Sequence, residues 1–380
     1  MKKVILIPDS FKGTISSIDV CQIMEREIKS VYPEAQTVSI PVSDGGEGAV
    51  DCFLAAMGGE KKYTQVTGVF GEPMQGFYGL LADQKTAVIE MACCAGLPLA
   101  EGRLDPSAAA TYGVGQLMMA AVGDGAKRII LGLGGSAGND GGCGLAAACG
   151  VFFTDPSGKE FIPTGGTLKQ IEHIHTARLD DRLKGVMITA ISDVDNPLFG
   201  KNGAAYVFGP QKGADEAMIR QLDVGLVHLN DLFVKELGKD VSLLPGAGAA
   251  GGMGAGVCAF LGAKLQMGIQ IILDAVGFDE HLSDADLVFT GEGRVDEQSL
   301  RGKVVVGVAR RAARQGVPVV AVVGDIAVAS EKLYSEGITA IFSSNTEAME
   351  FKKSKIYAKE NLAVTMKNIM RFAHIFNKIQ

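Results

Sequence analysis

The stretch that decides the fold is residues 128–142, RIILGLGGSAGNDGG, in which a short apolar strand runs into a glycine-rich loop. Glycine lets the backbone adopt positive φ and approach a ligand without interference from a Cβ atom. Successive amide N–H groups, with a helix expected to begin near residues 140–145, form a natural cradle for an anion. A tight turn that binds nothing is the structural alternative. So many glycines would weaken such a turn, which favours a phosphate-binding loop.

The same unit recurs along the chain: a short apolar strand followed by a polar, glycine-bearing loop. The expected strands are residues 4–7, 37–42, 129–131, 186–191, 287–289, 319–323 and 340–342. Continuous Val, Ile and Leu runs are typical of parallel strands buried on both faces, and helical stretches such as residues 16–31 and 302–316 lie between them. Ligands in open α/β sheets bind beyond the carboxyl ends of the strands. We therefore expect several of these loops to share one cleft.

The sequence predicts an α/β protein with two α/β domains. Residues 1–70 and 270–380 are expected to form a doubly wound, flavodoxin- or Rossmann-like domain with a parallel sheet. Residues 71–269 are expected to form an inserted α/β domain with a mixed sheet, which carries the glycine-rich phosphate loop. The cleft between the two domains is the expected place for the ligand.

Several local patterns fill in this outline. Alternating residues over 62–90 predict antiparallel or mixed strands, residues 108–122 a buried helix, and residues 203–208 another strand. The segment 343–380 has neither Gly nor Pro and predicts a long amphipathic helix. Its expected buried face consists of Leu362, Met366, Ile369 and Phe372.

Composition limits the function classes. The chain has 380 residues, 47% of them hydrophobic, and a net charge of −7, which gives no support to binding of nucleic acid or anionic membranes. The first apolar run stops at Pro8, too short for a signal peptide, and no segment predicts a membrane span. Seven cysteines among apolar neighbours predict reduced thiols in a cytoplasmic protein. The five histidines show no metal-binding spacing.

Charged side chains accompany the glycine turns. The cations are Lys12, Lys201, Lys212, Arg294, Arg301 and Lys303, and such groups can reach phosphate or carboxylate oxygens. The acids that follow strands are Asp44, Glu47, Asp193, Asp195, Glu292 and Asp296. Paired acids can hold Mg²⁺, and a single acid can accept the proton of an attacking hydroxyl. Capping of the following helices is the structural alternative.

Several enzyme signatures are absent from the sequence. There is no Walker A motif, no protein-kinase HRD or DFG arrangement, and no G-x-S-x-G elbow. The means of catalysis that remain are the positioning of the substrates and electrostatic stabilisation, and phosphoryl transfer depends on these two effects.

A family resemblance emerges from the motifs taken in order. They are PDSFKGTISS, PVSDGGEG, LGLGGSAGNDGG, GPQKGA, GAGAAGGMG and TGEGRVDEQSLRGK. This set resembles the type I glycerate kinases of bacteria from the first strand to about Ala321. The resemblance implies a two-domain α/β enzyme that uses ATP and Mg²⁺ to phosphorylate D-glycerate, usually to 2-phosphoglycerate. Gly138 departs from the family, which more often has Thr there; this removes one hydroxyl and leaves the backbone cradle.

Residue type, loop position and the resemblance together suggest roles. The residues expected to bind the nucleotide are Gly134, Gly135, Ser136 and Asn139, which cradle its phosphates, and Gly251 and Gly252, which cover it. The residues expected in catalysis are Asp193 as the proton acceptor, Asp296 as the alternative acceptor, and Lys12, which contacts the transferred phosphoryl group. D-glycerate is expected to contact Ser10, Asp44 and Arg294, and Mg²⁺ is expected to contact Glu292 and Asp195.

Two other classes of function stay open at this point. Gly132, Gly134 and Ala137 fit G-x-G-x-x-A, and Asp155 lies at the spacing of a ribose-binding acid, so an NAD(P)-dependent dehydrogenase of a small hydroxy acid is the alternative enzyme. A metabolite sensor without catalysis is the third class. The expected partners are small molecules, and a homodimer is an open alternative to a monomer.

Overall fold

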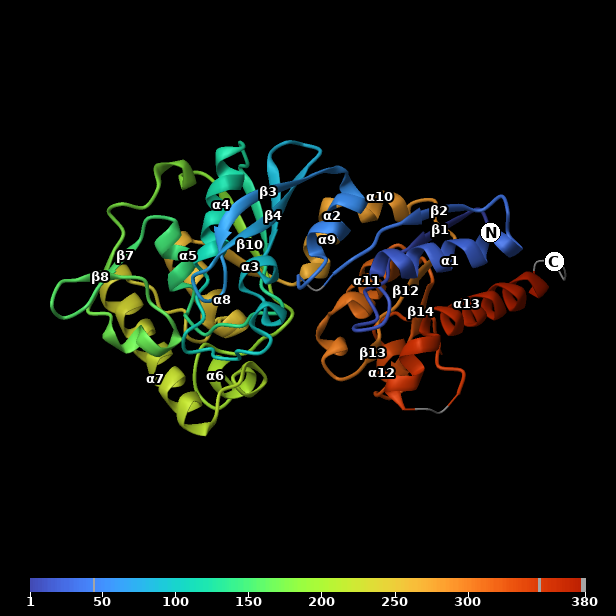
Figure 1. The fold of residues 1–380 in the computed structure, drawn as a ribbon. Coiled ribbons are helices and arrows are strands. Elements are labelled where there is room, and N and C mark those ends of the chain that lie inside the picture. Colours follow the sequence, from blue (N-terminus) through green and yellow to red (C-terminus); the bar gives the residue numbers. More distant parts are fainter. Residues whose placement is uncertain (44, 348–349, 377–380) are drawn as a thin grey trace. The chain divides into compact units, whose positions relative to one another are not determined.

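The computed structural model describes residues 1–43, 45–347 and 350–376, and the chain divides into two compact units (Figure 1). Unit 1 consists of Met1–Asp44, Ala55–Met57 and Met267–Gln380; unit 2 consists of Gly45–Leu54 and Gly58–Gln266. The chain first enters unit 2 at Gly45 and, after Ala55–Met57, again at Gly58, whereas the sequence predicts a boundary near residue 70. The reason is that β3 (Gly59–Thr67) pairs along its whole length with β4 (Pro73–Leu81), so both strands belong to unit 2.

Unit 1 is built on a fully parallel sheet. Its strands are β1 (Lys3–Leu6), β2 (Gln36–Ser39), β12 (Leu287–Thr290), β14 (Val319–Val323) and β16 (Ala340–Ser343). They lie in the order β2-β1-β12-β14-β16, which is the flavodoxin-like order of a doubly wound sheet. The predicted fold class is confirmed. A two-stranded ladder of β13 (Arg294–Val295) and β15 (Asp325–Ile326) lies beyond the strand ends.

Helices cover this sheet. They are α1 (Ser17–Val31), α9 (Gly268–Ala275), α10 (Phe278–Leu282), α11 (Val304–Ala313), α12 (Ser330–Tyr334) and α13 (Phe351–Phe376), with the 3₁₀ turn η6 (Ser299–Arg301). The Ser16 hydroxyl caps α1 by accepting the N–H of Asp19. Helices α1 and α13 lie side by side (Figure 1), and both pack against the apolar side chains of the sheet.

The buried face of α13 differs from the prediction at one residue. Leu362 and Met366 are fully buried and Ile369 is partly buried, as expected. Phe372 is 62% exposed, whereas Met370 is fully buried. At 100° per residue, Leu362, Met366 and Met370 follow one row, and Phe372 lies on the far side of Ile369 from that row.

Unit 2 is built on a mixed sheet in the order β11-β10-β6-β5-β4-β3. Its remaining strands are β5 (Thr86–Glu90), β6 (Arg128–Gly132), β10 (Met187–Ile191) and β11 (Lys264–Gln266). These four run parallel, while β3, β4 and β5 pair antiparallel, as the alternating pattern predicted. A small antiparallel sheet consists of β7 (Phe152–Thr154), β8 (Glu160–Phe161) and β9 (His173–His175).

The α-helices of unit 2 are α3 (Ala92–Ala95), α4 (Tyr112–Gly123), α5 (Cys143–Ala148), α6 (Ala204–Phe208), α7 (Glu216–Leu232) and α8 (Ala249–Leu261), and α2 (Ala49–Met57) spans the boundary. Shorter turns are η1 (Leu97–Ala100), η2 (Gly165–Gln170), η3 (Asp181–Leu183), η4 (Pro210–Lys212) and the π-helical η5 (Phe233–Leu237). The strand predicted at 203–208 is wrong, because α6 occupies it. Ala204 and Ala205 are buried while Tyr206 and Val207 are exposed, so no strand-like alternation exists.

Glycines let three loops of unit 2 pack backbone against backbone. A Cβ atom on Gly132 would overlap the carbonyl oxygen of Gly45, and one on Gly134 would lie 2.6 Å from Cα of Gly46. On the other side of the loop, a Cβ atom on Gly256 in α8 would overlap the carbonyl oxygen of Gly141. The glycine-rich loop is therefore held between the 45–46 segment and α8.

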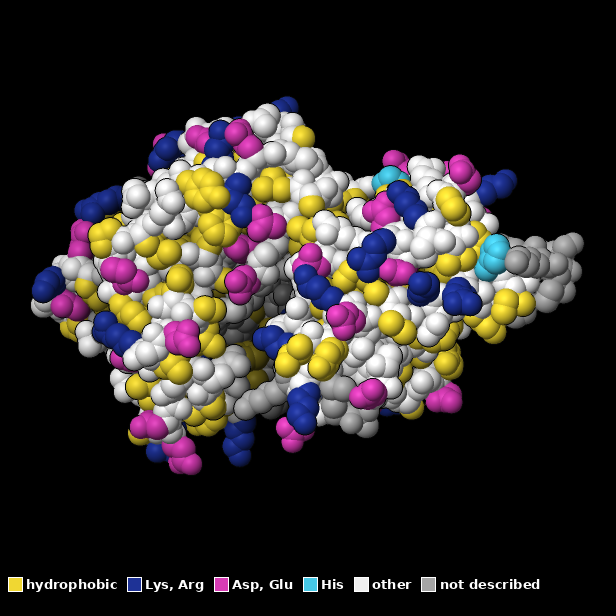
Figure 2. Space-filling model, turned by 45° about the vertical axis from the view of Figure 1, so that its right-hand side comes forward, with side chains coloured by type: hydrophobic (Ala, Val, Ile, Leu, Met, Phe, Trp, Pro, Cys, Tyr) yellow, Lys and Arg dark blue, Asp and Glu magenta, His cyan; other side chains and the backbone are white. Residues whose placement is uncertain are grey.

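The surface and the cysteines fit the composition. On the face drawn in Figure 2, basic and acidic side chains are interspersed, without a large patch of one sign. All seven cysteines are free thiols. No helix within the described ranges is long and apolar enough to cross a membrane.

The contact between α8 and the glycine-rich loop can be tested with two helical glycines. We expect Gly256→Ala to lower the free energy of unfolding by about 2–3 kcal/mol, because the new methyl group meets backbone that cannot move alone. Gly123→Ala, at the exposed end of α4, is the matched control: the nearest atom to its Cβ is 3.8 Å away. There we expect a gain of up to about 1 kcal/mol. Urea denaturation measures both, and equal stability of the two variants would contradict the packing described.

Candidate active site

The switch point of the unit 1 sheet lies between β1 and β12. From these neighbouring strands the sheet order runs outward in opposite directions, and ligands of such folds bind beyond the strand ends there. Asp9 and Ser10 lie in the loop after β1, and Glu292 lies in the loop after β12. A hydrogen bond joins the two loops: the N–H of Asp9 donates to the carbonyl oxygen of Gly291 at 2.8 Å.

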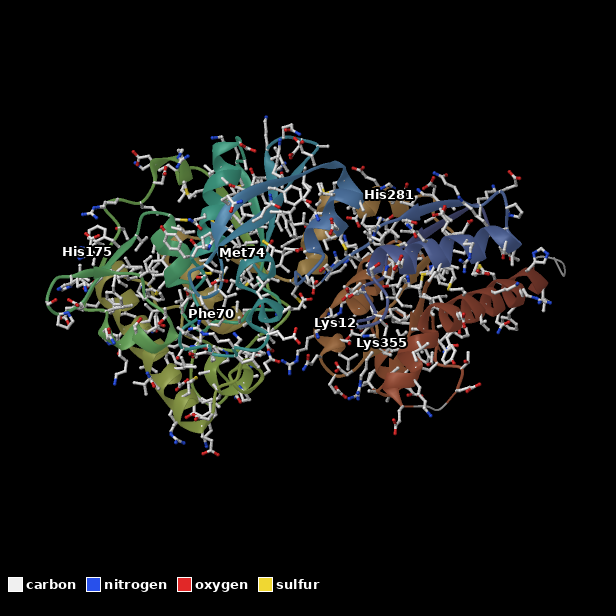
Figure 3. All side chains as sticks on the ribbon, in the orientation of Figure 1. Lys12, Phe70, Met74, His175, His281 and Lys355 are labelled. Carbon is white, nitrogen blue, oxygen red and sulfur yellow. The ribbon has the colours of Figure 1, made fainter. Side chains whose placement is uncertain are left out.

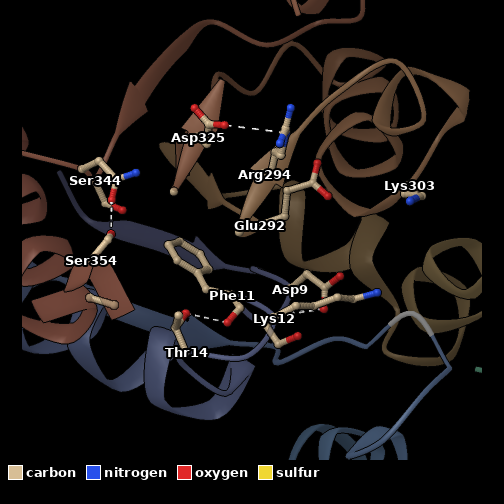
Figure 4. Close-up of a pocket in the computed structure, with 15 residues that line it drawn as sticks. Asp9, Phe11, Lys12, Thr14, Glu292, Arg294, Lys303, Asp325, Ser344 and Ser354 are labelled. Carbon is tan, nitrogen blue, oxygen red and sulfur yellow. Dashed lines mark hydrogen bonds and ion pairs between the residues drawn. The ribbon is translucent and has the colours of Figure 1, made fainter. Parts of the chain in front are cut away.

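A cavity of about 580 Å³ opens at this place (Figure 4). The charged residues that line it are Asp9, Lys12, Glu292, Arg294, Lys303 and Asp325. Polar and apolar lining residues include Ser10, Phe11, Thr14, Ser344, Asn345, Ser354 and Ala358. Of the residues predicted for the site, Ser10, Lys12, Glu292 and Arg294 are therefore brought together in one cavity. Asp296 is close to Glu292 in sequence but is not among the residues that line the cavity.

The loop after β1 is a tight turn that presents Lys12. The N–H of Phe11 donates to the carbonyl oxygen of Ile15, and the Thr14 hydroxyl donates to that of Phe11. Gly13 has φ of +74°, so a glycine suits this turn. Lys12 (labelled in Figure 3) is exposed, and it lines the cavity (Figure 4).

Glu292 is the buried carboxyl group of the cavity. It is 8% exposed, and its Oε1 atom has no hydrogen-bond partner among the described residues. Burial raises the pKa of Glu292 to about 7, although a hydrogen bond from Ser299 and the charges of Lys303 and Lys12 act in the opposite direction. An unpaired buried oxygen is costly unless a ligand meets it.

Two further cations flank Glu292. Arg294 forms an exposed ion pair with Asp325 at 3.6 Å, and such pairs contribute little, so its guanidinium can turn to an anionic ligand. Lys303 precedes α11, whose N-terminus has no side-chain cap. A cation there is unfavourable beside the positive end of the helix dipole unless an anion is bound. The cavity thus suits a small anion.

The glycine-rich loop of unit 2 follows β6. The N–H of Gly134 donates to Gly45 at 3.1 Å, and that of Leu133 donates to Ile191. The amide of Gly134, predicted for the phosphate cradle, is thus engaged in packing. Gly135 is exposed with φ of +76°, and its carbonyl oxygen accepts the N–H of Leu97.

The far end of the loop is fixed by Asp140. This carboxylate is fully buried and accepts the N–H and the hydroxyl of Thr111 and the N–H groups of Gly142 and Gly144. Burial raises the pKa of Asp140, while these hydrogen bonds lower it. Asp140 therefore joins α4 to the start of α5.

Ser136 and Asn139 lie in the middle of the loop. The Ser136 hydroxyl accepts a hydrogen bond from the ammonium group of Lys212 at 2.7 Å. Asn139 is 1% exposed, and neither its Nδ2 nor its Oδ1 has a partner among the described residues. Burial lowers the pKa of Lys212 to about 7 against the opposing charge of Asp140.

Gly251 and Gly252, predicted to cover the nucleotide, pack against the loop itself. Together with Ala250 they form a kink at the start of α8 in which all three residues have positive φ. The carbonyl oxygen of Gly251 accepts the N–H of Gly141, and a Cβ atom on Gly251 would overlap Gly138.

The remaining predicted residues follow strands of unit 2 or lie outside the described residues. Asp193 and Asp195 come after β10, which pairs with β6 so that Ile191 lies beside Gly132. Asp193 is half-buried and Asp195 is exposed. Asp44 falls outside the described ranges.

Some residues of these sites were not among those predicted. Asp9, Asp325 and Ser344 reach the unit 1 cavity from the ends of β1, β14 and β16. The rule that ligands bind beyond parallel strands could have indicated them. In the sequence Lys212 is one of several loop cations, and its burial depends on tertiary packing that no local pattern shows.

The comparisons with known proteins agree on one family. The sequence model of the glycerate kinase family matches residues 4–374. The chain is 46% identical to a glycerate kinase of Bacillus cereus, and 44% identical to glycerate 2-kinase of Escherichia coli K12, over 97% of each chain. The crystal structure of a protein described as glycerate kinase 2, from Salmonella typhimurium LT2, matches with a TM-score of 0.87 at 39% identity and covers 99% of both chains. The resemblance inferred from the motifs is confirmed: the chain belongs to the glycerate kinase family.

Proposed function

We propose that this protein transfers the γ-phosphoryl group of ATP to the C2 hydroxyl of D-glycerate and forms 2-phosphoglycerate and ADP. The family and the name of the Escherichia coli relative support the reaction and its position. With seven free thiols, the cytoplasm is the compartment we propose for it.

The observation that carries the proposal is the unit 1 cavity. The protein has a net charge of −7, so an anionic substrate needs local positive charge. Lys12, Arg294 and Lys303 supply that charge around one cavity at the switch point. We assign Arg294 and Ser10 to the carboxylate of glycerate, because guanidinium groups bind carboxylates bidentately. Lys12 neutralises charge on the transferred phosphoryl group.

The nucleotide is assigned to the glycine-rich loop of unit 2. Gly135, Ser136 and Asn139 remain the candidate contacts to its phosphates, whereas the N–H of Gly134 is engaged with Gly45. We assign Gly251 and Gly252 to support of the loop, because they pack against residues 138–141.

A magnesium ion is compatible with this assignment. Mg²⁺ in nucleotide sites is held by phosphate oxygens, water and one or two carboxylates, so a cage is not required, and no three ligating side chains gather in the described part of the chain. The unpartnered Oε1 of buried Glu292 fits one such contact, and exposed Asp195 is the second candidate. The bound ion would neutralise charge that develops on the phosphates.

Asp193 is our proposed acceptor of the hydroxyl proton. Its rival Asp296 accepts the N–H groups of Gln298 and Ser299 and so serves the turn that contains it. Asp193 follows β10, next to the strand that leads into the glycine-rich loop.

We expect Asp193→Asn to lower kcat about 100-fold, because the hydroxyl proton loses its acceptor. Steady-state kinetics measure this, and full turnover in this variant would remove Asp193 from the mechanism.

The dehydrogenase alternative has less support. Gly132 and Gly134 are explained by packing against residues 45–46. Asp155 accepts the N–H and hydroxyl of Ser157 and the N–H of Lys159, so it organises the turn between β7 and β8. It does not end a strand of the main sheet.

The reaction is tested by ADP release in the presence of ATP, Mg²⁺ and a panel of small hydroxy acids. We expect D-glycerate to give turnover, and phosphorus NMR to show the product phosphate on C2. Phosphate on C3 would contradict the position, and absence of D-glycerate-dependent ADP release would contradict the kinase activity itself. Binding of NADH in that case would support the dehydrogenase.

Arg294→Met tests the proposed carboxylate contact. We expect the KM for D-glycerate to rise at least about tenfold, because a charge-assisted bidentate contact is lost, with the KM for ATP nearly unchanged. The control is Arg26→Met: both arginine side chains are similarly exposed, 66% for Arg26 and 65% for Arg294, and Arg26 lies on α1 outside the cavity lining. Equal effects of the two substitutions would remove Arg294 from the substrate site.

The ionisation of Glu292 provides a pH-dependent prediction. We expect the ¹³C resonance of its carboxyl group, assigned by comparison with Glu292→Gln, to titrate near pH 7 in the metal-free protein and at lower pH with Mg²⁺ and ADP. Since the folded-state pKa exceeds the unfolded value, this group stabilises the fold at pH below about 4.5. That contribution is lost as the pH rises through 7. A midpoint near 4.5 in both states would contradict the burial of the carboxyl group and its contact with the metal.

A further inference from the structure

Lys212 is a buried cation whose hydrogen bonds end on the glycine-rich loop. It is 2% exposed at the end of η4, and its ammonium group donates to the Ser136 hydroxyl at 2.7 Å and to the carbonyl oxygen of Gly138 at 2.6 Å. Burying an ammonium group costs much free energy unless it is hydrogen-bonded. This cost indicates that Lys212 has a role in addition to packing.

The first contact fixes the direction of a hydroxyl proton. When Lys212 is charged, its ammonium group can only donate, so the Ser136 oxygen accepts from it and the O–H proton of Ser136 points elsewhere and can be donated. No acceptor for that proton is found among the described residues. An oxygen of a phosphate group is a suitable acceptor.

The second contact fixes the direction of a peptide dipole. The described peptide bonds are trans, so the C=O of one residue and the N–H of the next point in opposite directions. With the carbonyl group of Gly138 held by Lys212, the N–H of Asn139 points away from the ammonium group. In the same manner, the carbonyl group of Gly135 accepts from Leu97, so the N–H of Ser136 points away from Leu97.

These donors have no acceptor within the described part of the chain. The N–H groups of Ser136 and Asn139 form no hydrogen bond with the rest of the described chain, and the buried Asn139 side chain has no partner for either end. Buried donors of this kind are rare unless a ligand or water meets them. Asp140 anchors the far end of the loop through its bonds to Thr111 and Gly142.

We propose that Lys212 is a positioning residue for the nucleotide: it holds Ser136 and the 138–139 peptide so that their O–H and N–H groups point at phosphate oxygens. This inference rests on the proposed function, because it assigns the nucleotide to the loop. Lys212 itself acts through Ser136 and the backbone and takes no part in proton transfer.

The test compares two lysine substitutions. Lys212→Met removes both hydrogen bonds to the loop. Lys239→Met is the matched control, because the ammonium group of Lys239 also donates to two carbonyl oxygens, those of Cys258 and Ala259 at the end of α8. We expect Lys212→Met to weaken ADP binding, measured by calorimetry, at least about tenfold and to raise the KM for ATP equally. The KM of Lys212→Met for D-glycerate is expected to stay within about twofold of the wild type. The same holds for the ADP affinity and the KM for ATP of Lys239→Met.

Several outcomes decide the inference. If Lys212→Met does not fold, Ser136→Ala replaces it, since it deletes the hydroxyl held by Lys212, and the same loss of ADP affinity is expected. ADP affinity within twofold of the wild type in a folded variant overturns the inference, as does an equal rise of both KM values. A wild-type protein that binds ADP but shows no D-glycerate-dependent turnover refutes the proposed function, while the ADP-binding comparison still decides the role of Lys212.

Discussion

The close approach of backbone to backbone at glycine positions is the constraint on which unit 2 depends. Gly132 and Gly134 let the glycine-rich loop contact residues 45–46, and Gly256 lets α8 reach Gly141. Side chains at these positions would separate the segments and leave buried amides without partners. The same contacts consume amides at both ends of the loop, so the polar groups available to a ligand are confined to its middle.

In unit 1 the candidate site follows from the strand order, without a dense glycine loop. In the order β2-β1-β12-β14-β16 the carboxyl ends of β1 and β12 lie side by side. The connections after these two strands lead in opposite directions along the sheet, which leaves a crevice between them. Asp9 and Lys12 meet Glu292 there although about 280 residues separate them from it along the chain. The site is thus a consequence of the strand order, and its cations compensate for a negatively charged protein.

The sequence predicted those features that depend on local patterns. Continuous apolar runs predicted the parallel strands, and the loops after them drew attention to Lys12, Glu292 and Arg294, which line one cavity of unit 1. What the sequence could not predict depends on packing between distant segments. Glycines that bind a ligand and glycines that admit a second backbone look alike in sequence, so the sequence does not reveal that Gly134 and Gly251 pack against other backbone segments. The burial of Lys212 and the exposure of Phe372 depend on their tertiary neighbours, which no local pattern contains.

The central claim is that packing of the loop ends leaves the middle of the loop as a phosphate receptor. Amide ¹H–¹⁵N chemical shifts of Ser136 and Asn139, recorded with ADP and with adenosine, test it most directly. The account predicts large downfield proton shifts of both amides with ADP and little change with adenosine, because only the phosphates supply acceptors. Shifts that are absent with ADP, or equal with both ligands, would contradict it.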